Sequence, residues 1–538
     1  MTTIVSLNSS FKLVVDENIP RRRPNRASEF VKRYNPIKQK TTNAVRSNFQ
    51  LESSIAKTSL SRQMEHLVSY VERGSVENAL QLFNGMNKRS SFVWNLVIRA
   101  LTNNGYFEEA LDLYHQMCIE GVQPDKFTFP FVIKACGGCL DLVGGQKVHS
   151  NLFKVGLDSD LHVSNSLISM YAKVGHIRSA ENVFDEMPVR DLVSWNSMIN
   201  GYIFVNDGLT SLTFVSKMQQ SNIQPDRFTL VSALNASSLL RSLPNGKQIH
   251  AIIIKTKFES NEMIQTSLLD MYAKCDGIHY AEKFFNTISP RHVAAWNAMI
   301  RGYTLNNQPL ESFSCLTKMQ ENRINPDIIS LINFLPSCSH LQSTFSGKAV
   351  HGYAIRMGFL PHIVLETALI DMYGKCGNPN LSEIIFNRMD QRNLISRNTM
   401  IDADVKNGQY QNALKIFHEI WYDGFKPDAT TITVILDAIS DIAGLREGKP
   451  IHGYIVKTGV YSNTFVLNSL VYMYAKCGDL DSGRVIFDRI STKDVVSWNT
   501  IILANGLHGF GEISTGQIFD GMSTFEENRW VDHGGSQW

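Results

Sequence analysis

The sequence predicts an all-α protein, an α-solenoid built from repeated helix-turn-helix units. The first observation is a fixed period, because short phrases return every 101 residues over most of the 538-residue chain. A fixed period over most of a chain is typical of repeat architectures. Tryptophan marks this period at four of five positions, and Arg397 occupies the fifth. The tryptophans of this column are Trp94, Trp195, Trp296 and Trp498.

The second observation is the helical spacing of apolar residues inside each block. In the segment 91–117, apolar residues recur at steps of three and four in two sets, which predicts two amphipathic helices. Between two such sets lies a turn, and the equivalent turn positions of the repeats hold only residues that tolerate a left-handed backbone. A helix commonly ends at a residue with that backbone. One turn column is Gly105, Asn206, Asn307, Gly408 and Gly509, and a second is Gly175, Asp276, Gly377 and Gly478.

Composition agrees with an ordered array of helices. With 43% hydrophobic and 19% charged residues and only 16 prolines, the chain can bury a large core, so it is not a disordered protein. No run of about 18 apolar residues occurs. We therefore expect no membrane-spanning segment.

Residues 1–59 differ from the rest of the chain. They hold 11 Lys or Arg against 4 Asp or Glu, they are rich in Ser, Thr and Asn, and no acid precedes Asp16. This composition predicts an organelle transit peptide, with a disordered tail as the alternative. The uncharged opening MTTIVSLNSS favours a plastid (chloroplast) over a mitochondrion.

Two further kinds of column predict how the helices pack. Small residues mark close approach of two helices, and the tryptophan column predicts a large apolar wedge between neighbouring hairpins. Arg397 is therefore expected to pack less well than the four tryptophans. The small columns are Ala110, Ser211, Ser312 and Ala413, and Ala180, Ala281, Ser382 and Gly483.

Each block of 101 residues divides into three hairpins. The second block gives 192–226 and 227–261, each 35 residues long, and 262–292, which is 31 residues long. Tetratricopeptide arrays repeat uniformly every 34 residues, so this alternation excludes them.

At this point the motifs resemble a known family. The phrases VSWNSMINGY, FTFPFVIKAC with GGQKVH, and SNSLISMYAKVG with AENVFDEMPVRD are similar to the P, L and S motifs of plant pentatricopeptide repeat proteins. The resemblance implies a right-handed α-solenoid superhelix that binds organellar RNA. It covers 60–529 in three parts: a degenerate S-like repeat (60–90), four P-L-S triplets (91–494) and a final incomplete P-like repeat (495–529). A divergent tail (530–538) follows them.

The resemblance implies that the fifth residue and the last residue of a motif together address one RNA base. Amide or hydroxyl groups beside a carboxylate can address the edge of an unpaired base. The alternative is local, because Asp before a helix is an ordinary N-cap and Asn in a first turn can bond locally. In the P motifs these pairs are Asn95 with Asp125, Asn196 with Asp226, Asn297 with Asp327, and Asn398 with Asp428. In the S motifs they are Asn165 with Asp191, Thr266 with His292, Thr367 with Asn393, and Asn468 with Asp494.

Two basic columns are candidates for phosphate contacts, although each member alone is an ordinary surface charge. Because residues 60–538 hold 41 basic against 46 acidic residues, affinity for RNA requires a local basic stripe. The columns are Lys154, Lys255, Arg356 and Lys457, and Arg190, Arg291, Arg392 and Lys493.

Cysteine and histidine columns predict structural roles. One column holds three cysteines, which predicts small buried residues of a repeated helix: Cys275, Cys376 and Cys477. The CGGC motif, Cys136 to Cys139, has redox spacing but lacks the strand and helix context that a redox motif requires. Histidines spaced by whole blocks cannot converge on one metal, so neither a metal nor a cofactor is expected. The histidines of this column are His149, His250, His351 and His452.

Many members of the family's triplet subclass end in a cytidine deaminase domain, whose zinc site needs His-x-Glu. None of the 15 histidines is followed two residues later by Glu, so no deaminase, no other enzyme and no small-molecule substrate is expected. The leading hypothesis is an RNA-binding specificity factor for C-to-U editing, with a deaminase-bearing or editing-complex partner in trans. The alternatives are an RNA stabilisation or processing factor, a protein-binding scaffold, and a truncated relative of a longer editing factor.

Overall fold

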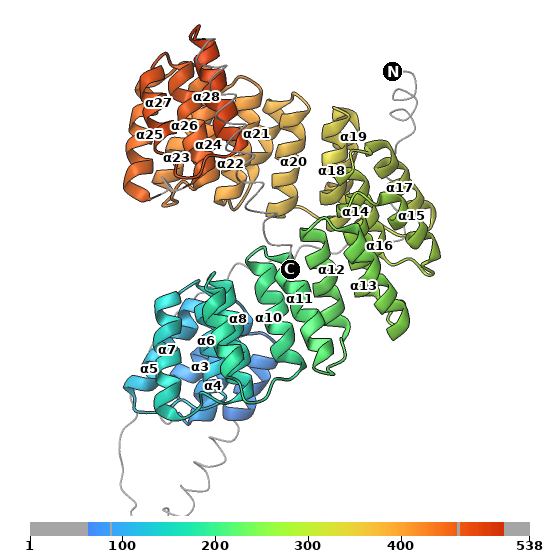
Figure 1. The fold of residues 1–538 in the computed structure, drawn as a ribbon, viewed down its shortest axis with the longest axis vertical. Helices are drawn as coiled ribbons and strands as arrows, with labels where there is room; N and C mark the ends of the chain where they lie inside the picture. The colour runs from blue at the N-terminus through green and yellow to red at the C-terminus, as the bar shows by residue number, and fades with distance from the viewer. Residues whose placement is uncertain (1–62, 87–88, 460–462, 511–538) are drawn as a thin grey trace, which may run out of the picture. The chain divides into compact units, whose positions relative to one another are not determined.

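The structure is a computed structural model that describes residues 63–86, 89–459 and 463–510, and in these residues every regular element is a helix (Figure 1). The chain forms two compact units, which meet between Ala298 and Met299 inside helix α16 (Val293–Leu305). Each unit is described by itself below. The predicted transit peptide (1–59), the part of the final repeat after residue 510 and the divergent tail (530–538) lie outside the described residues.

The first unit is a series of hairpins, each with a first and a second helix. A helix over 63–72 pairs with α3 (Val76–Asn84), and twelve helices follow before α16. They are α4 (Ser91–Asn103), α5 (Phe107–Ile119), α6 (Phe129–Gly138), α7 (Leu142–Val155), α8 (Leu161–Lys173), α9 (Ile177–Glu186), α10 (Leu192–Phe204), α11 (Gly208–Gln220), α12 (Arg227–Leu239), α13 (Leu243–Thr256), α14 (Glu262–Lys274) and α15 (Ile278–Thr287).

The second unit repeats the same arrangement. Its helices are α17 (Pro309–Glu321), α18 (Ile328–His340), α19 (Thr344–Arg356), α20 (Ile363–Lys375), α21 (Pro379–Arg388), α22 (Leu394–Lys406), α23 (Tyr410–Tyr422), α24 (Ala429–Asp441), α25 (Leu445–Thr458), α26 (Thr464–Lys476), α27 (Leu480–Asp488) and α28 (Val495–Leu507).

The helices of each unit form two layers. First helices contact the next first helix, as α6 contacts α8 and α8 contacts α10, and α20 contacts α22 and α22 contacts α24. Each second helix packs on the first helix of its own hairpin and on that of the next, as α5 packs on α4 and α6. We call these the first-helix layer and the second-helix layer. The predicted α-solenoid of helix-turn-helix repeats is therefore confirmed.

The two turn columns adopt the backbone predicted for them. Gly105, Asn206, Asn307, Gly408 and Gly509 have φ between 58° and 84°, and the column that begins at Gly175 has φ between 55° and 86°. A left-handed residue ends each first helix and turns the chain back into the second helix. The small columns are confirmed as well, because Ala110, Ser211, Ala180 and Ser382 are fully buried.

The tryptophan column is the predicted wedge. Each ring meets edge-on a phenylalanine from the second helix of the preceding hairpin: Phe83 meets Trp94 at 4.8 Å between ring centres, and Phe184 meets Trp195 at 5.0 Å. Phe285 with Trp296 and Phe487 with Trp498 repeat this contact at 4.9 and 5.1 Å.

Arg397 departs from this packing as expected, but it is not loosely packed. It is only 4% exposed, and its Nη2 lies 2.5 Å from Oδ2 of Asp423, within its own hairpin. Its Nε and Nη1 have no hydrogen-bond partner. An ion pair thus replaces the apolar contact between hairpins.

Across the described residues, we find no helix with the length and apolar character needed to cross a membrane.

Candidate functional site

The predicted Asn and Asp partners are in direct contact in the first-helix layer. In five of the pairs, the amide nitrogen Nδ2 of Asn donates a hydrogen bond to Oδ1 of the Asp that precedes the next first helix. The N–O distances are 2.9 Å for Asn95 with Asp125, 3.2 Å for Asn196 with Asp226, 3.3 Å for Asn398 with Asp428, and 3.4 Å for both Asn165 with Asp191 and Asn468 with Asp494. Each pair therefore joins two adjacent hairpins.

The same aspartates are helix N-caps, which confirms the local role given as the alternative and leaves base reading a prediction. Oδ1 of Asp226 accepts the backbone N–H of Thr229 at 2.8 Å, and Oδ1 of Asp191 accepts that of Ser194 at 2.8 Å. The side chains of Thr229 and Ser194 complete capping boxes at α12 and α10. Because these bonds all end on Oδ1, the second oxygen, Oδ2, is left available to a ligand.

Three of these carboxylates, those of Asp191, Asp226 and Asp494, are held in the ionised form. Burial raises the pKa of Asp191, Asp226 and Asp494, but hydrogen bonds from the following Ser or Thr and from the paired Asn outweigh burial and lower the pKa below its ordinary value. Each pair thus presents a fixed acceptor beside an amide.

Two predicted pairs are not joined by a hydrogen bond in the described chain. Thr266 and Thr367 donate instead to the backbone carbonyls of Glu262 and Ile363, one turn earlier, at 2.9 and 2.7 Å. His292 and Asn393 accept the backbone N–H of the third residue after them. A threonine side chain is too short to reach the next hairpin while it makes this local bond.

Asn297 and Asp327, the members of the last pair, belong to different units, and each is described by itself. Asn297 is buried in the first unit, and Asp327 caps α18 in the second with a capping box to Ser330.

Exposed apolar side chains beside these pairs were missed by the sequence reasoning. They occupy the second position of the repeat motifs, next to the buried stripe but outside it, and each is more than a third exposed. A periodic apolar residue one place ahead of the stripe was the signal that could have identified them. They are Phe92, Phe127, Val193, Phe228, Met263, Ile329, Val364, Ile395, Phe465 and Val496.

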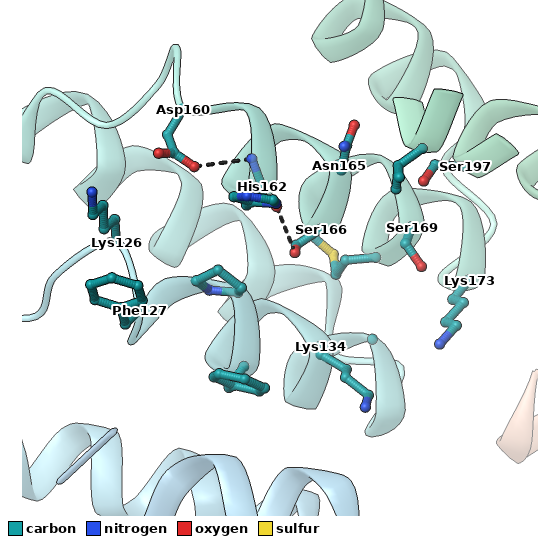
Figure 2. A pocket seen from close by; sticks show the side chains of 15 residues that line it. Lys126, Phe127, Lys134, Asp160, His162, Asn165, Ser166, Ser169, Lys173 and Ser197 are labelled. Atoms are coloured by element: carbon teal, nitrogen blue, oxygen red, sulfur yellow. Dashed lines mark hydrogen bonds between the residues drawn. The ribbon is translucent and has the colours of Figure 1, made fainter. Parts of the chain in front are cut away.

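A pocket of about 730 Å³ lies on the first-helix layer of the first unit, across α6, α8 and α10 (Figure 2). Asn165 lines it together with the exposed Phe127 and Val193. Its charged residues are Lys126, Lys134, Lys173 and a single carboxylate, Asp160, which caps α8. The pocket therefore combines the asparagine of one pair, apolar surface and net positive charge.

The predicted basic columns lie elsewhere. Nε and Nη2 of Arg190 donate to the carbonyls of Phe184 and Asp185 at 2.8 Å each, and its guanidinium lies over the Phe184 ring at 4.9 Å. Arg291, Arg392 and Lys493 bind the end of the preceding second helix in a similar way. The Arg190 column thus caps helix C-termini, and its phosphate contacts stay a prediction.

The Lys154 column sits in the second-helix layer. Lys154, Lys255, Arg356 and Lys457 occupy the last turns of α7, α13, α19 and α25, where a cation stabilises the helix dipole. The pocket is lined instead by Lys126, Lys134 and Lys173, which belong to no column that we had predicted.

The histidine column has the expected structural role. Nδ1 of His149, His250, His351 and His452 lies 2.7 to 3.2 Å from a tyrosine hydroxyl of the next first helix, and burial lowers the pKa of each imidazole.

The cysteines also look structural. All eight are free thiols, and burial raises the pKa of Cys136 to about 12, the reverse of what a reactive thiol needs. Within the described ranges, no group of three or more His, Cys, Asp or Glu could hold a metal ion.

Comparison with known proteins identifies the repeats. A model of the pentatricopeptide (PPR) repeat family matches residues 89–138, and the PPR repeat model matches six segments. These are 163–192, 193–223, 294–324, 367–394, 395–425 and 465–495.

Two relatives from Arabidopsis thaliana match most of the chain. The chloroplastic pentatricopeptide repeat-containing protein At4g35130 is 45% identical over 472 residues, which are 87% of this chain and 58% of that protein. The chain therefore spans little more than half the length of that relative. The pentatricopeptide repeat-containing protein At3g16610 is 34% identical over 451 residues, covering 82% of this chain and 68% of the relative.

Among solved structures, the maize pentatricopeptide repeat protein PPR10 in complex with an 18-nucleotide psaJ RNA element is 17% identical, with a TM-score of 0.48 over 88% of this chain and 79% of that one. The repeat matches and the two Arabidopsis relatives are sufficient for an assignment: this chain belongs to the pentatricopeptide repeat family.

Proposed function

We propose that this chain binds single-stranded RNA and that each Asn or Thr with its partner at the end of the motif addresses one base. The observation that carries the proposal is the repeated Asn–Asp contact in the first-helix layer, with exposed apolar side chains next to it. An apolar surface can support the face of a base while the polar pair meets its edge. Lys126, Lys134 and Lys173 supply charge for the phosphates in the pocket of the first unit.

The proposed reading order follows from the P-L-S assignment of 91–494. Under the pairing habit that the family resemblance implies, Asn with Asp favours U over C, Thr with Asn favours A, and Thr266 with His292 favours a purine. With the L motifs unread and the N-terminus toward the RNA 5′ end, the order is U-n-U-U-n-R-U-n-A-U-n-U. The fourth nucleotide is then read by Asn196 with Asp226, and the tenth by Asn398 with Asp428.

A gel shift at fixed salt tests this proposal. The chain should bind this 12-nucleotide RNA more tightly than an RNA of the same composition in scrambled order. Substitution Asn398→Thr, beside Asp428, should move the preference at the tenth nucleotide from U toward G. If the unaltered chain and the variant rank the U and G RNAs alike, the Asn–Asp pairs serve only as caps and the proposal is wrong.

Among roles on RNA, we propose a specificity factor for C-to-U editing of plastid transcripts, with catalysis supplied by a partner that carries a deaminase. The triplet pattern supports editing, and the names of three relatives, which include the word chloroplastic, support the plastid. Sequencing of RNA co-immunoprecipitated from isolated plastids, with editing scored in plants that lack the protein, tests both. Unchanged editing with lower transcript abundance would favour RNA stabilisation instead.

A protein-binding scaffold is the second candidate, and one feature of the second-helix layer favours it. A pocket of about 240 Å³ lies between α23 and α25 and is lined by Phe417, Trp421 and Tyr454, with Tyr422 89% exposed nearby. Partner proteins that co-purify after nuclease treatment, without crosslinking to RNA, would support this function.

A further inference from the structure

A hydroxyl side chain lies three residues after the aspartate of every joined Asn–Asp pair. Its backbone N–H donates to Oδ1 of that aspartate at 2.7 to 3.0 Å in all five cases. The five pairs nevertheless fall into two groups, because the hydroxyl group is threonine in three of them and serine in two. The threonines are Thr128, Thr229 and Thr431, and the serines are Ser194 and Ser497.

The threonine hydroxyls contact both members of their pairs: each lies 2.8 to 3.1 Å from Oδ1 of the aspartate and also reaches the asparagine. Thr128 donates to Oδ1 of Asn95 at 2.6 Å, and Thr229 donates to Oδ1 of Asn196 at 2.7 Å. Thr431 and Asn398 repeat this bond at 2.8 Å. In these pairs, the amide is bound at both ends: its nitrogen donates to the aspartate and its oxygen accepts from the threonine.

The serine hydroxyls do not reach the asparagine. Ser194 and Ser497 donate to the aspartate instead, at 2.8 Å each. Oδ1 of Asn165 and of Asn468 is then buried without a hydrogen-bond partner, and Nδ2 of each lies 3.4 Å from the aspartate. One end of these amides is free, and the other is held by a long bond.

The difference decides what a base would meet. An amide bound at both ends presents an N–H beside the free carboxylate oxygen, which suits uracil, because uracil offers carbonyl acceptors and an N3–H donor. In the same register, cytosine places its amino donor opposite the amide N–H and its N3 acceptor opposite the carboxylate, so it opposes that arrangement. An amide that can turn offers its oxygen to the cytosine amino group as well. Sites held in place by a supporting contact discriminate better than sites that adapt.

We propose that Thr128, Thr229 and Thr431 are positioning residues that make their Asn–Asp pairs strict for U over C, whereas the pairs followed by Ser194 and Ser497 tolerate both pyrimidines. This inference rests on the RNA reading proposed above. It assigns the first, fourth and tenth nucleotides to the strict group and the third and twelfth to the tolerant group.

Thr229→Val tests the proposal, because it removes the hydroxyl and keeps the shape of the side chain. Ser194→Ala is the matched control, since it removes a capping-box hydroxyl that does not touch the asparagine. Dissociation constants are measured at fixed salt for 12-nucleotide RNAs with U or C at the third or fourth nucleotide, after circular dichroism has shown equal helix content.

The unaltered chain should separate U from C at the fourth nucleotide about two- to tenfold more strongly than at the third, the equivalent of one net hydrogen bond. Thr229→Val should reduce the ratio at the fourth nucleotide to that at the third, and Ser194→Ala should change neither ratio. Thr431→Val with Ser497→Ala repeats the test at the tenth and twelfth nucleotides.

Equal effects of the two substitutions on base preference would overturn the inference, as would an unchanged ratio in Thr229→Val. If the unaltered chain shows no base preference at either nucleotide, the proposed RNA reading itself has failed.

Discussion

Arg397→Trp should stabilise the second unit, because it restores the ring contact found at the four other positions of its column. At those positions the tryptophan meets a phenylalanine of the preceding hairpin, whereas the equivalent ring, Phe386, lies under the guanidinium of Arg392 at 4.7 Å, with Arg397 in the tryptophan column. Arg89 and Arg291 cover their phenylalanines in the same way with the tryptophan present. The new ring should therefore fit beside Arg392.

The magnitude follows from three contributions. The ring pair is worth about 0.5 to 1.5 kcal/mol. Arginine leaves two buried N–H groups unpaired where tryptophan leaves one, and each such group costs about 1 to 3 kcal/mol. Against these gains stands the lost ion pair with Asp423, whose side chain is 47% exposed, so the pair contributes about 0 to 1 kcal/mol. The net expectation is a gain of about 2 kcal/mol.

Urea unfolding followed by circular dichroism measures this gain. Because repeat arrays need not unfold in one step, hydrogen exchange of α21 to α23 provides a local measure of the same change. Arg397→Leu is the control: it removes the charge without supplying the ring, so it should gain less than the tryptophan variant. A tryptophan variant that unfolds at lower urea than the unaltered chain would refute the reasoning and show that the Asp423 pair is needed.

Two further predictions concern charge. Burial, with Glu383 nearby, raises the pKa of the fully buried Asp404 from 3.8 to about 7, so the folded state holds a proton that the unfolded state releases between about pH 4 and 7. Asp404 should therefore destabilise the folded state increasingly as pH rises through that interval. In urea unfolding, Asp404→Asn should be more stable than the unaltered chain by a few kcal/mol at pH 8 and equally stable near pH 4. A constant difference in the free energy of unfolding across this range would contradict the raised pKa of Asp404. Lys173→Ala should lower the salt dependence of RNA binding by about one phosphate contact. Arg190→Ala should lower the free energy of unfolding by about 1 to 2 kcal/mol and leave the salt dependence of RNA binding unchanged. A reduced salt dependence in Arg190→Ala would show that the Arg190 column contacts RNA phosphates.

The hairpins could be predicted from the sequence because their determinants are local. A glycine or asparagine at a left-handed turn, as at Gly105 and Asn206, acts through its own backbone, so its column shows the turn without any knowledge of neighbours. The tryptophan wedge could be predicted from the size of the side chain and its recurrence every 101 residues. Arg397 shows the limit of this reasoning, because its column indicated that a contact was missing but not that Asp423 would supply another.

The basic residues were harder to assign for a physical reason. A period of 101 residues shows that Arg190, Arg291 and Arg392 occupy equivalent places, but the direction of a long side chain depends on which acceptors lie within its reach. The carbonyls of Phe184 and Asp185, at the end of the preceding second helix, lie within reach of Arg190 and bind its guanidinium. Lys134 donates to Oδ1 of Asn103 at 2.9 Å, and both Lys134 and Lys173 line the pocket.

Helix capping and base reading first stood as rival interpretations of the same aspartates, and the geometry makes them compatible. One carboxylate oxygen of Asp226 accepts the helix N–H of Thr229 and the amide of Asn196, which fixes the rotamer of the aspartate and holds it ionised. The other oxygen is thereby aimed by the cap and needs no rearrangement to meet a ligand. Removing the aspartate itself should then weaken base preference as well as helix stability. For this reason, the variants that separate the two roles are those at Thr229 and Asn398, which touch the amide and keep the aspartate.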